Sequence, residues 1–130
     1  MMIRLDMKGD IPIYMQIRNQ IVLGIGRGEL AAGQPLPTVR RLAEDAGVNV
    51  MTVSKAYALL KEEGYIETDR RRGACVTPAP PCDPGFCAKL SDSLSILAAE
   101  ARARGMQSRE FLDFCRNVME NMGQGSETVL

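Results

Sequence analysis

The chain of 130 residues contains no histidine. Histidine is the side chain most often used for general acid–base catalysis and the commonest metal ligand in proteins. The sequence also lacks a G-x-x-x-x-G-K-[S/T] phosphate-binding motif and a G-x-S-x-G nucleophile elbow. These absences argue against an enzyme, and the sequence predicts no catalytic residue and no cofactor.

Long apolar runs are absent as well. The first nine residues mix Arg4, Asp6 and Lys8 with apolar residues, so they lack the apolar stretch of a signal peptide. No window approaches the length of about 20 apolar residues that a membrane helix needs. Hydrophobic residues make up 45% of the chain and charged residues 25%, a balance typical of soluble globular proteins. We expect a cytoplasmic protein with no membrane partner.

Net charge is zero, because 16 Lys+Arg balance 16 Asp+Glu. The distribution is uneven: residues 1–77 hold 11 basic and 9 acidic side chains, whereas residues 78–130 hold 5 and 7. Basic residues gather at Arg40–Arg41 and at Arg70–Arg72. The potential at a nucleic-acid groove depends on such clusters more than on the total charge. Zero net charge therefore does not exclude DNA as a partner.

The four cysteines are Cys75, Cys82, Cys87 and Cys115. Thiols of cytoplasmic proteins are kept reduced, so we expect plain thiols, with Cys75 packing in a strand and the others at a helix start and in a helical core. Cys82 and Cys87 could hold a metal or form a switchable disulfide with Cys115, but their x4 spacing matches no common zinc pattern. A redox- or metal-responsive role for these cysteines is the alternative, and the favoured interpretation has no metal site.

One break in composition divides the chain. Residues 78–84 include four prolines, and proline disrupts helices and sheets because it fixes φ and lacks an N–H donor. We predict a first domain over residues 1–77, a proline-rich linker over 78–83 and a C-terminal region over 84–130.

Three helices are predicted in the first domain. Apolar residues repeat at helical spacing in each: Ile13, Ile17, Ile21 and Ile25 in the first, Val39, Leu42, Ala43 and Ala46 in the second, and Val53, Ala56, Tyr57 and Leu60 in the third. Thr38 and Asn49 are suited to cap the second and third helices, and Gly47 to end the second. Two short helices joined by so brief a turn are typical of a helix-turn-helix.

A β-hairpin is predicted after the third helix, which Gly64 ends. Residues 65–68 and 74–77 favour two strands, and Asp69–Gly73 favours the tip between them. The fold class that follows is mainly α with a small β-hairpin: a winged helix-turn-helix followed by a two-helix tail.

The tail is predicted as two amphipathic helices, one from Asp83–Pro84 to Gly105 and one over residues 108–121. Two helices of this length cannot bury both apolar faces against each other, so we expect them to cover a partner surface. The apolar candidates for that surface are Leu90, Leu94, Leu97, Ala98, Phe111, Cys115, Val118 and Met119.

Many residues between Pro12 and Val76 follow one family pattern. They are Pro12-Ile13-Tyr14, Gln16-Ile17, Gly28-Glu29-Leu30, Gly33, Leu36-Pro37-Thr38, Val39-Arg40-Arg41-Leu42-Ala43, Gly47-Val48-Asn49, Thr52-Val53, Ala56-Tyr57, Leu60, Glu63-Gly64-Tyr65-Ile66 and Arg72-Gly73-Ala74-Cys75-Val76. This pattern resembles the head of GntR-family regulators, and the short tail after a proline-rich linker is similar to the YtrA subfamily. The resemblance implies a DNA-binding transcription regulator that forms a homodimer through its tail and represses a transporter operon.

Specific reading of DNA needs a helix that fits the major groove, with short polar side chains at its N-terminal end. On the third helix the candidates are Asn49, Met51, Thr52, Ser54 and Lys55. The structural alternative is that Asn49 only caps the helix and that Thr52 and Ser54 are ordinary solvated residues.

Thr38, Arg40 and Arg41 are candidates at the start of the second helix. The helix macrodipole disfavours cations there, so a bound anion would explain the two arginines. The resemblance implies that the arginine matching Arg40 reaches DNA. We expect a double-stranded operator with an inverted repeat, and the sequence leaves open whether a small-molecule effector is a further partner.

At the hairpin tip, the arginines of Arg70–Arg72 and Gly73 could lie along phosphates or enter the minor groove, although such charge runs are usually just solvated. The resembled family usually has glycine where Arg71 stands. Some relatives fuse this head to an aminotransferase-like domain of several hundred residues, for which this chain has no room.

Overall fold

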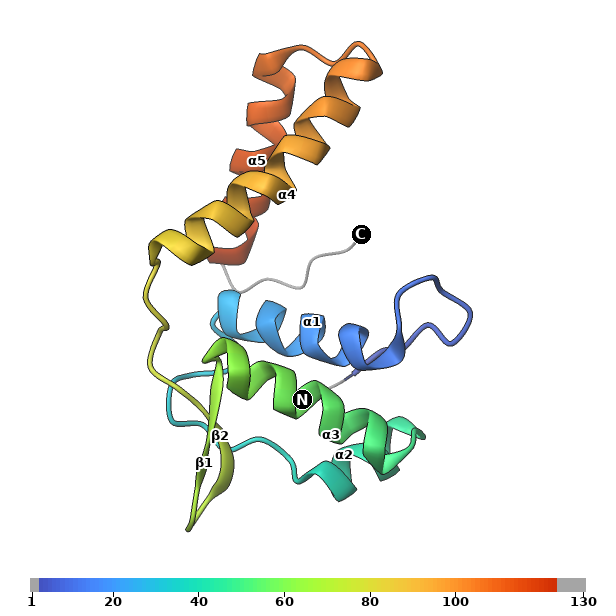
Figure 1. Ribbon diagram of the computed structural model, residues 1–130, viewed down its shortest axis with the longest axis vertical. Coiled ribbons are helices and arrows are strands. Elements are labelled where there is room, and N and C mark those ends of the chain that lie inside the picture. Colours follow the sequence, from blue (N-terminus) through green and yellow to red (C-terminus); the bar gives the residue numbers. More distant parts are fainter. Residues whose placement is uncertain (1–2, 124–130) are drawn as a thin grey trace. The chain divides into compact units, whose positions relative to one another are not determined.

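Residues 3–123 are described by a computed structural model, which divides into two compact units (Figure 1). The first unit ends at Pro80 and the second begins at Pro81, within the proline-rich segment. The order of elements is α1 (Ile13–Gly26), α2 (Val39–Ala46), α3 (Val50–Glu63), β1 (Ile66–Asp69), β2 (Gly73–Val76), α4 (Pro84–Ala103) and α5 (Ser108–Gly123). The predicted fold class is confirmed: a helix-turn-helix with a two-stranded wing, then two helices.

Side-chain caps fix where α2 and α3 begin. The Thr38 hydroxyl accepts a hydrogen bond of 3.0 Å from the backbone N–H of Arg41. The Asn49 side chain accepts one of 2.7 Å from the N–H of Met51. Between the two helices Gly47 has φ 70°, a left-handed conformation that glycine adopts without a Cβ clash. The start of α2, its end and the start of α3 are therefore each specified by a local signal, as predicted.

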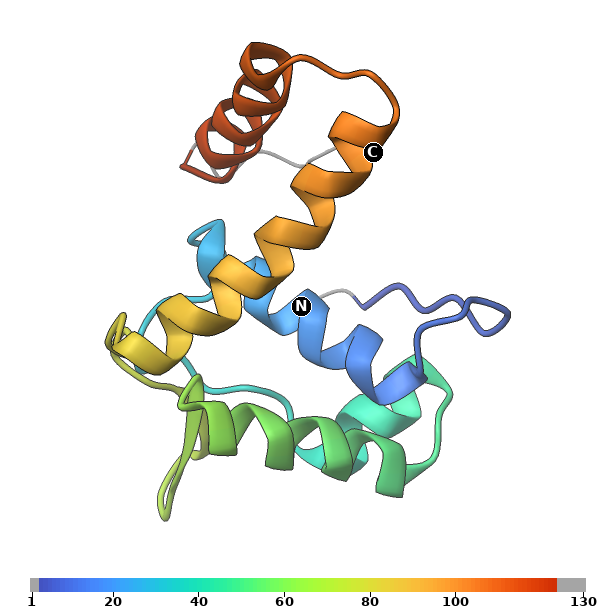
Figure 2. The ribbon, with the colours of Figure 1, turned by 45° about the horizontal axis from the view of Figure 1, so that its top comes forward.

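The core of the first unit forms where α3 packs against α1 and α2. Ile17 and Ile21 of α1 are fully buried there, whereas Ile13 and Ile25 at the two ends of the same helix are only partly buried. The buried side chains of α3 are Val53, Ala56, Tyr57 and Leu60, and Leu42 and Ala43 complete the contact from α2. Figure 2 shows α1 and α3 running alongside each other.

The hairpin begins and ends one residue away from its predicted bounds. Asp69 and Gly73, predicted for the tip, are the last paired residues of the ladder. Gly73 has φ 74°, which lets the chain turn tightly into β2. The segment before α2 joins the wing, because the N–H of Leu36 donates to the carbonyl of Ala74 at 2.8 Å. Strand β2 of the wing is thus hydrogen-bonded to the segment that precedes α2.

An ion pair that contains two hydrogen bonds joins α1 to the end of α3. The Arg18 guanidinium donates to both carboxylate oxygens of Glu63, at 2.9 and 3.0 Å, and both side chains are mostly buried. The hydrogen bond with Glu63 raises the pKa of Arg18 above its ordinary value. Such a bidentate pair fixes geometry as well as charge, so it holds the C-terminal half of α3 in place.

The second unit is a helical hairpin without a closed core. Asp83 caps α4 by accepting a hydrogen bond of 2.8 Å from the N–H of Phe86, and Pro84 follows at the first helical position. α5 ends two residues later than predicted, which is within the usual uncertainty of a helix end. Neither helix has a buried residue. Within residues 3–123, no helix is long and apolar enough to cross a membrane.

From the burial of Tyr57 we predict how the free energy of unfolding depends on pH. Its hydroxyl donates a 2.7 Å hydrogen bond to the carbonyl of Pro37, and burial raises its pKa to about 12. An exposed tyrosine of the unfolded chain titrates near about pH 10. The folded state therefore keeps a proton that the unfolded state loses, so this contribution is complete below about pH 10 and disappears as the pH rises to about 12.

Tyr57→Phe tests this dependence by urea unfolding. Near neutral pH the variant should lose about 1 kcal/mol, the usual net value of one hydrogen bond. Above about pH 10 the gap between wild type and variant should narrow, because only the wild type carries the titrating hydroxyl. A gap that stays constant up to about pH 11 would show that the buried hydroxyl does not stabilise the fold in this way.

Candidate DNA-binding surface

The N-terminal half of α3 presents one face to solvent. Val53, Ala56 and Tyr57 are buried in the core, so the residues on the opposite side of the helix point outward. Met51 is 74% exposed and Ser54, Lys55 and Ala58 are also exposed, while Thr52 lies half-buried at the edge of this face. Four of the five DNA contacts predicted for this helix therefore share one surface. The fifth, Asn49, is the N-cap at the beginning of that surface.

The first turn of α2 adds two exposed arginines beside this face. Arg41 forms an ion pair of 3.3 Å with Asp45, one turn further along. Exposed pairs of this kind contribute little stability, so the pair leaves Arg41 able to exchange partners. Arg40 is exposed and has no ion-pair or hydrogen-bond partner within residues 3–123. Of the two, Arg40 is the cation that the fold leaves free.

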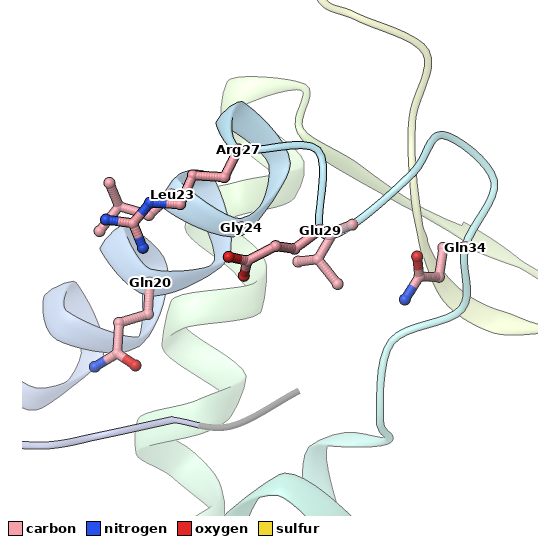
Figure 3. Close-up of a pocket in the computed structure, with 7 residues that line it drawn as sticks. Gln20, Leu23, Gly24, Arg27, Glu29 and Gln34 are labelled. Carbon is pink, nitrogen blue, oxygen red and sulfur yellow. The ribbon is translucent and has the colours of Figure 1, made fainter. Parts of the chain in front are cut away.

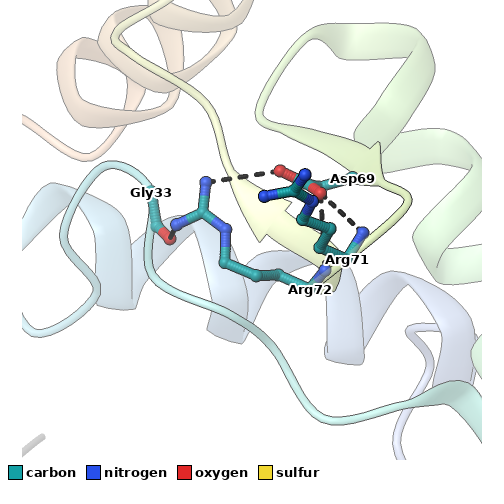
Figure 4. Close-up of polar contacts among 4 residues, drawn as sticks. All are labelled: Gly33, Asp69, Arg71 and Arg72. Atoms are coloured by element: carbon teal, nitrogen blue, oxygen red, sulfur yellow. Dashed lines mark hydrogen bonds and ion pairs between the residues drawn. The ribbon is translucent and has the colours of Figure 1, made fainter.

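The wing tip is organised around Asp69 (Figure 4). Its carboxylate accepts a 2.7 Å hydrogen bond from the backbone N–H of Arg71 and a 3.4 Å one from that of Arg72. The hydrogen bond from Arg71 is the main reason why the pKa of Asp69 lies below its ordinary value. Arg71 itself does not adopt a positive φ, since every positive φ in the described residues belongs to a glycine. The Asp69 contacts and Gly73 thus close the turn without the glycine that the family usually has at position 71.

The three wing arginines are not equivalent. Arg72 donates a 3.0 Å hydrogen bond to the carbonyl of Gly33 and lies 3.4 Å from the Asp69 carboxylate, so it holds the tip against the segment before α2 (Figure 4). The guanidinium groups of Arg70 and Arg71 have no such partner among the described residues. The sequence could not separate these roles, because the contact with Gly33 joins positions 39 residues apart.

Sequence reasoning missed one residue of this surface. Tyr14, in the first turn of α1, places its ring under the Lys55 ammonium, 4.1 Å from the ring centroid. Its position in a helix that otherwise supplies core side chains gave no signal, and only the packing of α1 on α3 brings the two residues together.

A separate cavity of about 340 Å³ lies at the other end of α1, lined by residues of that helix and of the loop after it (Figure 3). Gln20 is engaged there, with its amide bonded to the backbone of Arg4. Gln34 accepts a hydrogen bond from the N–H of Ala31. The Nε of Arg27 is buried and has no hydrogen-bond partner among residues 3–123. None of the predicted DNA contacts lines this cavity.

The cysteines do not come together as a metal site. Cys75 is 1% exposed and packs in β2, as its place in the strand predicted. Cys82 and Cys87 are exposed and Cys115 is half-buried, all as free thiols. Among the described residues, no three His, Cys, Asp or Glu side chains are arranged to hold a metal ion.

Comparison with known proteins places this geometry in a family. The sequence profile of "Bacterial regulatory proteins, gntR family" matches residues 13–76. The HTH-type transcriptional repressor YtrA of Bacillus subtilis is 30% identical over 128 residues, which span 97% of this chain and 98% of that protein. The chain belongs to the GntR family. Its similarity to YtrA extends through the tail, so this GntR regulator is YtrA-like, and the family is one of transcriptional regulators and not of enzymes.

Two solved structures extend the comparison. The transcriptional antiterminator from Listeria monocytogenes EGD-e matches 100% of this chain and 98% of its own, with a TM-score of 0.87 and 25% identity. The DNA-binding domain of AraR in complex with operator ORX1 matches 58% of this chain and 96% of its own, with a TM-score of 0.52 and 25% identity. GntR DNA-binding domains of this fold bind operator DNA, and the GntR head described here is a DNA-binding module of that kind.

The unequal roles of the wing arginines can be measured. Arg70→Ala and Arg71→Ala should weaken binding to operator and random duplexes alike and lower the salt dependence by about one ion per lost phosphate contact. Arg72→Ala should instead speed hydrogen exchange of the wing amides in the free protein, since it removes the contact with Gly33. Wing protection in Arg72→Ala equal to that of Arg70→Ala would refute the positioning role.

Proposed function

We propose that the chain is a transcriptional repressor that binds an inverted-repeat operator as a homodimer. The observation that carries the proposal is the exposed face of α3, flanked by the free cation Arg40 and by the wing tip. An α-helix has about the diameter of the major groove, so α3 can enter the groove with its N-terminal half against the base edges. The proposed partner is double-stranded DNA. The proposed location of the protein is the cytoplasm.

Base reading is proposed for the contacts nearest the start of α3. Thr52 and Ser54 offer short hydroxyls, and Asn49 can use the part of its amide that the cap leaves free. Arg40 carries a guanidinium that can pair with the two acceptors of a guanine. The roles proposed for Thr38, Arg41, Lys55, Arg70 and Arg71 are phosphate contacts, which position the protein without reading sequence.

Dimerisation is proposed for the tail. Of the thirteen large hydrophobic side chains exposed within residues 3–123, nine lie on α4 and α5, although these helices make up only the smaller unit. On α4, Leu90, Leu94 and Leu97 form one stripe and are 40–55% exposed. On α5, Val118 and Met119 are 51% and 70% exposed. A monomer rarely leaves so much apolar surface in water, and a second copy would cover it symmetrically.

The other predicted interface residues lie nearer the contact between the two helices. Ala98, Phe111 and Cys115 are half-buried, and Ala98 and Phe111 line a cavity of about 240 Å³ beside the turn that joins α4 to α5. Sequence reasoning passed over Phe86, Ile96 and Phe114, which are 40%, 65% and 62% exposed. We propose that the stripe residues form the centre of the dimer interface and that the half-buried residues support it.

Repression rests on the likeness to YtrA, which is named a repressor and is similar over nearly its whole length. A transporter operon as the target is only what the resemblance of the short tail to the YtrA subfamily implies. A repressor needs only to occupy its operator, and the chain supplies the parts for that: a reading head and a dimerising tail. A small-molecule effector would have to change the spacing or the mobility of two heads to release the DNA.

A redox-responsive regulator is the second candidate. Cys82 and Cys87 are exposed near the start of α4, where oxidants can reach them. Operator affinity measured with and without reductant, and with added zinc or copper, separates this candidate from control by a small molecule. Unchanged affinity in all of these conditions would eliminate it.

The operator proposal predicts a two-fold symmetric motif. Selection from random duplexes should return an inverted repeat whose half-sites lie about one helical turn, roughly 10 base pairs, apart. Arg40→Ala should then weaken binding to the selected operator about tenfold or more, with a much smaller loss on a scrambled duplex, because a base contact discriminates by about 1 to 3 kcal/mol. Equal losses on both duplexes would make Arg40 a phosphate contact, and thermal unfolding checks that the variant is folded.

Dimerisation through the tail predicts that a mutation in α4 changes the oligomeric state. Leu97→Asp places a charge in the apolar stripe and should shift the protein from dimer to monomer in sedimentation, with a large loss of operator affinity. Ala99→Asp is the matched control, because residue 99 lies on the opposite side of α4 and is exposed. A Leu97→Asp protein that remains dimeric would show that copies pair elsewhere.

A further inference from the structure

We propose that the hollow between the first turns of α1 and α3 receives a backbone phosphate of DNA, with the Tyr14 hydroxyl as a donor and the Tyr14 ring holding Lys55 at the same phosphate. The proposal rests on the DNA-binding function above and adds to it a contact from α1, a helix to which neither the family pattern nor the comparisons assign a role in binding. Both helices begin at the same end of the first unit, as Figures 1 and 2 show.

The hollow is formed by the part of α3 that reads DNA. It has a volume of about 800 Å³, and Tyr14 lines it together with Met51, Thr52, Lys55 and Ala58. Ala58 is exposed and small, so its side chain leaves room beside Lys55 on the α3 side of the hollow. A group that enters from solvent would therefore meet Tyr14 and Lys55 side by side.

Lys55 is held in position but keeps its charge available. Its ammonium lies 4.1 Å from the centroid of the Tyr14 ring, a cation–π geometry. No carboxylate forms an ion pair with Lys55 within residues 3–123. A lysine side chain loses much rotamer freedom when it binds, and the ring reduces that loss by ordering the side chain beforehand. The Tyr14 ring thus orders the Lys55 ammonium before a phosphate binds.

The Tyr14 hydroxyl is a second, unused donor. It makes no hydrogen bond with any residue that the structure describes. Tyr57 provides the contrast within the same domain, since its hydroxyl is committed to the carbonyl of Pro37. Tyrosine hydroxyls are regular donors to DNA phosphates, and the ring alone would have been enough to hold Lys55. A partner for the hydroxyl is therefore expected from outside the chain.

The shape of the groove explains why that partner is a phosphate. The major groove is about 12 Å wide, close to the diameter of a helix with its side chains. A helix whose exposed face meets the base edges therefore has its flanks against the two sugar–phosphate walls. Lys55 lies on the flank of α3 next to α1, where Tyr14 of α1 contacts it, so a phosphate of one wall would come to the hollow.

Tyr14→Phe is the decisive variant, because it keeps the ring and removes only the hydroxyl. We expect about three- to tenfold weaker binding to the selected operator and to random duplex alike, the usual effect of losing one hydrogen bond. The salt dependence should stay unchanged, since no charge is lost. Lys55→Ala should reduce the salt dependence by about one ion, and Tyr14→Leu should lower affinity further than Tyr14→Phe because it also releases Lys55.

Tyr57→Phe is the matched control: it should lower thermal stability and leave DNA affinity unchanged. A duplex in which one phosphate is replaced by a neutral methylphosphonate, moved along the operator, locates the contact. At that position the wild type should lose affinity and Tyr14→Phe should lose little more.

Three results would overturn the proposal. Tyr14→Phe could bind both duplexes as tightly as the wild type. It could lose affinity on the operator alone, which would make Tyr14 a base contact. It could show the same additional loss at every methylphosphonate position. A wild-type protein that binds no duplex would instead refute the proposed function, so the two failures are distinguishable.

Discussion

The burial of one stripe of α3 determines what the rest of the first unit can do. Val53, Tyr57 and Leu60 are at most 3% exposed, and they belong to the core that α3 forms with α1 and α2. Burying an apolar side chain of this size is worth about 1.5 to 3 kcal/mol, so rotating α3 about its axis would cost several such terms. The face that carries Ser54 and Lys55 is therefore fixed in direction before any DNA arrives. The Arg18–Glu63 pair holds the other end of the same helix.

Polar contacts then position the wing and the starts of α2 and α3 around that helix. Asp69 closes the wing tip, and Arg72 holds it to Gly33 at 3.0 Å. The caps at Thr38 and Asn49 orient the starts of two helices toward one surface. The basic residues of the chain thus act through position and not through number, which is why a protein with no net charge can still present cations to DNA. The tail has the opposite character: its helices bury no residue fully and leave large apolar side chains exposed.

Much of this could be predicted from sequence because the signals are local. The caps, the left-handed Gly47 and the apolar periodicity of α1 and α3 depend on neighbours within a few residues, and each was predicted correctly. The strands were displaced by one residue because the pairing of Asp69 with Gly73 depends on the ladder and not on composition. The contacts of Arg72 with Gly33 and of Tyr14 with Lys55 join positions 39 and 41 apart, where a single sequence carries no pairing signal. The predicted DNA and dimer contacts remain predictions, since they concern partners.

The proposed function depends most on the N-terminal half of α3 lying in the major groove. A photoreactive side chain at Met51, which is 74% exposed on that face, tests it most directly against one at Lys61, which is exposed near the C-terminal end of the same helix. Irradiation with the selected operator should crosslink position 51 to bases in both half-sites and position 61 far less. Efficient crosslinking from position 61 with none from position 51 would contradict the account.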